Sequence, residues 1–145
     1  KDGKDKEARW NMMMASTEGA MAFSKGLGAV HSMSHATGAN QELRLHHGTL
    51  NAVILPAVLE FNQNHVGNKY SRIARAMGKN ESINLANEIR KLNENIGIPS
   101  GLAEMGVTED MIPELVTHSI TDPSNLTTPR LPSEEEWEKL FLESM

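Results

Sequence analysis

The sequence predicts an all-helical protein. Apolar residues recur at helical spacing along nearly the whole chain, and the one stretch that resembles a buried strand, VILPAV, contains Pro56, which a central strand does not tolerate. The chain has 145 residues, of which 39% are hydrophobic, and this length is sufficient for one domain with a sizeable core. We therefore expect residues 1–145 to form a single helical domain.

Three helices are expected in the first half of the chain. The first covers about residues 6–24 and carries a face of small residues suited to close helix contact. The second begins near Gly26–Gly28. The third begins near His47–Gly48, because apolar residues from Leu50 to Phe61 occur at i, i+3, i+4, i+7, i+8 and i+11. This is the period of a buried helical stripe. Pro56 lies inside this helix and lacks an N–H group, so we expect a kink there.

Two helices are expected in the middle of the chain. A short one covers about residues 67–77. The next runs from Ser82 to Ile96 and has apolar residues along one face. Gly97, followed by Pro99, is a typical helix stop.

Two further helices are expected toward the C-terminus. In the helix around residues 108–121, Pro113 is tolerated only in the first turn, which favours Asp110 over Thr108 as the cap. Residues 122–132 contain three prolines and predict an irregular connector with a short helical turn at its start. Ser133 and Glu136 match a capping box, and an apolar stripe follows them, so the last helix should dock on the body of the protein.

Composition excludes several classes of function. Lys and Arg (14) and Asp and Glu (19) give a formal net charge of -5, and the basic residues are scattered, which argues against nucleic acid as a partner. No apolar run approaches the roughly 20 residues needed to cross a bilayer, and the first residues do not resemble a signal peptide. The sequence contains no cysteine. We expect a cytoplasmic protein in which any metal has nitrogen and oxygen ligands.

The histidines form the most informative pattern. His31 and His35 are four residues apart, so one helical turn directs both imidazoles the same way. His46 and His47 follow a glycine-containing loop and can be presented to the same space by the next helix. This spacing suits a metal site, but on its own it is weak evidence, and polar helix positions or hydrogen-bonded core histidines are the alternative. Two other histidines are expected to be structural or solvated: His65 and His118.

Four segments carry a family resemblance. FSKGLGAVHSMSH and the following HHGTLNAVILPAVLEFN resemble the hallmark region of the iron-containing (group III) alcohol dehydrogenases. KYSRIARAMG and NENIGIPSGLAEMGV are similar to the family's C-terminal helices. The resemblance covers essentially the whole chain. It implies the C-terminal helical bundle domain of a dehydroquinate synthase-like alcohol dehydrogenase.

The resemblance also implies roles for particular residues. His31 and His47 would be ligands of the catalytic divalent metal, either iron or zinc. His35 would lie near the nicotinamide cofactor and take part in a proton relay. Many members have Pro-His-Gly and a shorter preceding loop where this chain has His46-His47-Gly48, so His46 is the alternative ligand. Phe23 matches an aromatic residue near the substrate pocket, and a core role at the end of its helix is the alternative.

Some of the family's parts are not recognisable in the chain. The family has an α/β domain that binds the dinucleotide and a D-x-x-x-H segment that supplies two more metal ligands. The chain therefore resembles the C-terminal part of a longer enzyme that would act on a small alcohol or aldehyde with NAD or NADP and would be inactive as a fragment. Two alternatives remain: a non-catalytic helical interaction module, which could bind a second copy of itself, and a histidine-based metal carrier.

Overall fold

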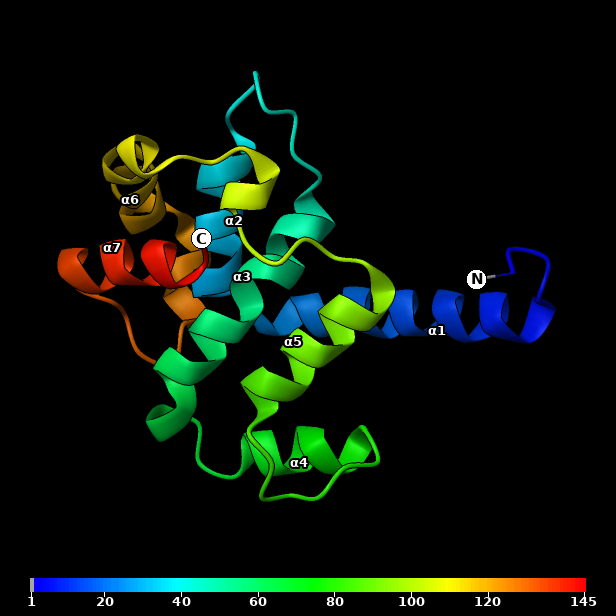
Figure 1. Ribbon diagram of the computed structural model, residues 1–145. Helices are drawn as coiled ribbons and strands as arrows, with labels where there is room; N and C mark the ends of the chain where they lie inside the picture. The colour runs from blue at the N-terminus through cyan, green and yellow to red at the C-terminus, as the bar shows by residue number, and fades with distance from the viewer. Residues whose placement is uncertain (1) are drawn as a thin grey trace.

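The computed structural model describes residues 2–145, and Figure 1 shows the arrangement of its helices. All regular structure in that range is helical, which confirms the predicted fold class. No helix described there is long and apolar enough to cross a membrane. The seven α-helices are α1 (Lys6–Ala22), α2 (Ala29–Gly38), α3 (His47–Asn62), α4 (Lys69–Ala76), α5 (Leu85–Ile96), α6 (Ile112–Thr121) and α7 (Glu134–Glu143).

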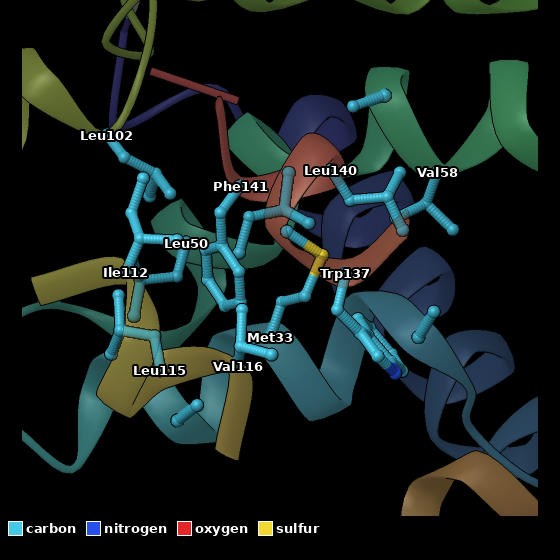
Figure 2. Packing of buried hydrophobic residues seen from close by; sticks show 14 of the residues in the cluster. Met33, Leu50, Val58, Leu102, Ile112, Leu115, Val116, Trp137, Leu140 and Phe141 are labelled. Atoms are coloured by element: carbon cyan, nitrogen blue, oxygen red, sulfur yellow. The ribbon is translucent and has the colours of Figure 1, made fainter. Parts of the chain in front are cut away.

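The core forms around α2. This helix packs against both α3 and α6, while α3 also packs against α5 and α7, and α6 against α7. Figure 2 shows how side chains from these helices gather, with Met33 of α2 beside residues of α6 and α7. The largest fully buried side chains are Trp137, Phe141, Met33, Leu50 and Ile54.

The predicted start and stripe of α3 are confirmed. The helix begins at His47 and contains Pro56, and five of the six stripe residues are buried. The sixth, Phe61, is half-buried and packs against the same core. The expected stop of α5 is also present, because Gly97 adopts the left-handed conformation, with φ of 77°.

The predicted cap of α6 is wrong. A 3-10 turn, Glu109–Met111, precedes the helix, and Met111 stands at the N-cap position without a side-chain cap. The Met111 N–H donates to the Thr108 carbonyl over 3.0 Å. The turn itself therefore satisfies a backbone donor near the helix start, and Asp110 is not needed as a cap.

Helix α5 differs from expectation at its start. It begins at Leu85 because the Asn84 side chain accepts the backbone N–H of Asn87 and caps the helix there. The apolar face of the helix is not buried along its whole length, since Leu92 and Ile96 are 45% and 63% exposed.

Helix α1 stands apart from the core. It buries none of its residues, and Figure 1 shows it extending to one side of the other helices. The close helix contact expected from its small residues is thus not made within residues 2–145. Instead Trp10, Met12, Met13 and Met21 are all largely exposed.

The C-terminal helix docks as predicted. Residues 122–132 hold the short 3-10 helix η5, Pro123–Thr127, and α7 follows. Ser133 accepts the Glu136 backbone N–H, while the Glu136 side chain accepts the Ser133 N–H over 2.9 Å. This capping box starts the helix that places Trp137 and Phe141 in the core.

Replacing Ser133 with alanine should lower the free energy of unfolding by about 1 kcal/mol, because the helix loses its N-cap acceptor. Urea denaturation of the full-length protein that carries this chain measures the change. Ser133→Thr retains the hydroxyl and is the control. Equal stability of Ser133→Ala and the parent would show that the cap does not stabilise the helix.

Candidate metal centre

Helix α2 and the first turn of α3 bring three imidazoles together, which we call the histidine cluster: His31, His35 and His47. The ring centroids of His31 and His47 lie 5.3 Å apart, those of His31 and His35 5.7 Å apart. His35 and His47 stack at 5.3 Å with an interplanar angle of 18°. His31 is half-buried, whereas His35 and His47 are exposed, so the cluster forms part of an open surface.

Asn51, one turn after His47 on α3, links two members of the cluster. Its Nδ2 lies 3.0 Å from His47 Nε2 and 3.5 Å from His31 Nε2. An amide nitrogen only donates, so both Nε2 atoms present their lone pairs to the same point. His31 and His47 therefore point their unprotonated nitrogens at one small region.

Ser34 fixes the other side of the His47 ring. Its hydroxyl is fully buried on α2 and lies 2.9 Å from His47 Nδ1. Because Nε2 accepts from Asn51, the neutral ring carries its proton on Nδ1 and donates it to Ser34. Such a hydrogen bond on the far nitrogen is the usual way to orient a metal-binding imidazole.

The surroundings of His31 and His47 favour their neutral forms. Burial lowers the pKa of His31, and the neighbouring His47 and His35 lower it further. Burial also lowers the pKa of His47, with a further contribution from His35. Neutral imidazole is the form that binds a metal.

His35 has a different partner from the other two rings. Its Nδ1 lies 3.0 Å from Asp122 Oδ2, a carboxylate at the junction of α6 and η5. Burial raises the pKa of Asp122, but hydrogen bonds from Ser124 and His35 together outweigh that effect and the pKa lies below its ordinary value. Asp122 therefore accepts a hydrogen bond from the Nδ1–H group of His35.

The remaining candidate residues lie at the edge of the cluster or away from it. His46 is the N-cap of α3, and its Nδ1 accepts the Thr49 backbone N–H. The Phe23 ring meets His31 edge-on at 6.4 Å between centroids and is 60% exposed. His65 and His118 are exposed on other elements, as expected.

The donor atoms of the cluster suit a divalent cation, although the set is incomplete. Two neutral imidazole nitrogens face one point, and Asn51 Oδ1 beside them is buried without a hydrogen-bond partner in the described chain. Nitrogen and oxygen donors of this kind fit iron or zinc. Within residues 2–145, however, no three His, Cys, Asp or Glu side chains form a complete metal-binding group. The residues present therefore fit part of a metal's coordination sphere.

Comparison with known proteins identifies the family. The Fe-containing alcohol dehydrogenase family, C-terminal, matches residues 1–145. The chain belongs to the iron-containing alcohol dehydrogenase family. It is 41% identical to the 4-hydroxybutyrate dehydrogenase of Cupriavidus necator over 152 aligned residues, which include 100% of this chain. It is 37% identical to the NAD-dependent methanol dehydrogenase of Bacillus methanolicus, with 90% of the chain aligned.

The fold agrees with this assignment to the iron-containing alcohol dehydrogenases. An alcohol dehydrogenase structure from Oenococcus oeni superimposes with a TM-score of 0.92 at 26% identity, covering 99% of this chain and 39% of that one. The chain spans 40% of the length of the Cupriavidus relative and 36% of the Bacillus relative. The family members therefore contain a large part that this chain does not match.

Sequence reasoning missed three polar partners of the cluster: Ser34, Asn51 and Asp122. The first two could have been found from helical spacing, since Asn51 is four residues after His47 and Ser34 lies between the two α2 histidines. Asp122 carries no such signal, because it is 87 residues from His35 and lies in a segment expected to be an irregular connector.

The lowered pKa of His31 and His47 predicts a loss of stability in acid. Just below the ordinary pKa of 6.5, these rings are mostly protonated in the unfolded chain but remain mostly neutral in the folded chain. The free energy of unfolding of the metal-free, full-length protein should therefore fall as the pH drops through about 6.5.

Urea denaturation between about pH 7.5 and about pH 5 measures this dependence. The double variant His31→Asn/His47→Asn should flatten the curve, whereas the exposed His65→Asn should not. The same slope in all three proteins would rule out the two cluster histidines as its source.

Proposed function

We propose that the protein carrying this chain is an NAD(P)-dependent, metal-dependent oxidoreductase of small alcohols or aldehydes. In this proposal His31 and His47 bind the metal, and His35 relays a proton. The metal assignment rests on one observation: the Nε2 atoms of His31 and His47 both lie within 3.5 Å of Asn51 Nδ2. The names of the relatives support the choice of substrate and cofactor class.

Each residue of the cluster has a defined task in this proposal. His31 and His47 hold the metal through Nε2, and Ser34 keeps the His47 proton on Nδ1. When bound, the metal supplies Lewis-acid polarisation of the substrate oxygen while hydride passes between the substrate carbon and the nicotinamide. His35 accepts the hydroxyl proton at Nε2 and passes it to solvent. Phe23 offers an apolar surface beside His31 for the carbon chain of the substrate.

Further parts of the site must come from outside this chain. Two neutral imidazoles carry no negative charge to compensate a divalent cation, which usually also has a carboxylate or thiolate ligand. We propose Fe²⁺ as the metal, with Zn²⁺ as the alternative, and NAD or NADP bound by the rest of a longer protein. The chain alone would then be inactive.

A helical interaction module is the second candidate, and helix α1 favours it. Trp10 and three methionines of α1 are 62–70% exposed, and an exposed apolar surface of this kind is typical of contact sites. A second copy of the chain could cover it. Measuring metal separates the two candidates, because an interaction module requires none.

Replacing His31 or His47 with alanine in the full-length protein should reduce metal affinity by more than about 100-fold, beyond the 10–100-fold typical of an outer-shell change. Metal content after purification and competition with a chelator measure the effect. His65→Ala is the matched control and should bind metal as the parent does. Parental metal content in both cluster variants would refute the ligand assignment.

Ser34→Ala should weaken metal binding by about 10–100-fold without removing a ligand, because His47 loses the acceptor that fixes its tautomer. Ser144→Ala removes an equally buried hydroxyl, which donates to the Leu140 carbonyl on α7, and should leave the affinity unchanged. Chelator competition measures both variants. Equal affinities would show that Ser34 does not orient His47.

A further inference from the structure

We propose that Asp122 is the positioning residue for His35. This inference rests on the proposed proton-relay role of His35. The carboxylate at the start of η5 accepts the Nδ1 proton of the ring over 3.0 Å. Neutral imidazole carries one proton, so a proton held on Nδ1 leaves Nε2 with a free lone pair.

The Asp122 carboxylate is fixed through both of its oxygens. Oδ1 accepts the Ser124 backbone N–H over 2.8 Å and so caps η5, while Oδ2 faces His35. Its side chain is only 14% exposed. A capping aspartate needs one oxygen for the helix, and here the second oxygen is directed at a ring on another helix.

The segment around Asp122, between α6 and η5, is connected to α2 by hydrogen bonds. The Ser32 hydroxyl donates to Asn125 Oδ1 over 2.6 Å, and Asn125 Nδ2 donates to the Ser119 carbonyl over 2.6 Å. Ser119 also donates to the Ser32 carbonyl over 3.4 Å. Ser32 lies one turn before His35 on α2, so these contacts hold the Asp122 carboxylate beside the His35 ring.

This geometry defines how His35 handles a proton. The hydroxyl proton of the substrate moves to Nε2, and the ring becomes an imidazolium with protons on both nitrogens. Asp122 remains ionised and stabilises that cation. Release of the Nε2 proton to water restores the starting ring with its Nδ1 proton still held by Asp122.

Asp122→Asn is the variant that tests the assignment. The asparagine oxygen can still cap η5 through Ser124, because asparagine is as good an N-cap as aspartate. With that oxygen on the cap, the amide nitrogen takes the place of Oδ2 and donates to Nδ1, so the proton of the neutral His35 ring moves to Nε2. In the full-length, metal-loaded protein, kcat for alcohol oxidation should fall by about 10–100-fold while KM for the alcohol stays the same, which is a part of the roughly 100- to 10,000-fold that positioned proton transfer supplies.

Two further readouts exclude a purely structural effect. Nitrogen-15 NMR of the histidine rings, with the His35 signal assigned from its loss in His35→Asn, should show the Nδ1-protonated form in the parent and the Nε2-protonated form in Asp122→Asn. In a His35→Asn background, adding Asp122→Asn should not lower kcat further. Asp110→Asn, an exposed carboxylate on the turn before the other end of α6, is the charge-matched control and should leave the ring signals and kcat unchanged.

Specific results would overturn the inference. A parental His35 protonated on Nε2, an unchanged tautomer in Asp122→Asn, or an undiminished loss of kcat in the His35→Asn background would each do so. The ring signals do not require metal or activity. Failure of the metal assignment would therefore appear in the His31 and His47 variants, and failure of the Asp122 assignment in the tautomer of His35.

Discussion

The burial of α2 between α3 and α6 is the constraint on which the histidine cluster depends. Six of the ten residues of this helix are buried, including Met33 and Ser34. The remaining face carries His31 and His35, because residues four apart project from the same side. Packing of the apolar face therefore determines where the imidazoles point. The same packing brings the first turn of α3, with His47, against α2.

Identical side chains have different neighbours within the histidine cluster. His31 and His47 face an amide donor and have pKa values lowered by burial and by neighbouring histidines. His35 lies in the same cluster, but its Nδ1 is bound to a carboxylate. A neutral ring beside an amide is suited to bind a cation, whereas a ring held by a carboxylate is suited to take up and release a proton.

Much of the fold could be predicted because its signals are local. The stripe of α3, the left-handed Gly97 and the Ser133 capping box each depend on residues within a few positions of one another. The cap of α6 could not be predicted reliably, since a 3-10 turn and an Asp110 cap satisfy the same donors. The exposure of Leu92 and Ile96 on α5 could not be predicted, because apolar periodicity shows that a face is apolar and does not show which surface covers it.

In the candidate site, too, the contacts between nearby residues were predictable and the contacts between distant residues were not. The spacing of His31 and His35 indicated a shared direction, and the family resemblance implied His31 and His47 as ligands and His35 as the relay, but neither indicated the contacts that hold each ring. The contact between His35 and Asp122 depends on long-range packing, because Asn125 and two buried serines connect the end of α6 to α2. The exposed apolar surface of α1 illustrates the same limit. Nothing within residues 2–145 buries a residue of this helix, so neither local periodicity nor the packing of α2 defines what would cover it.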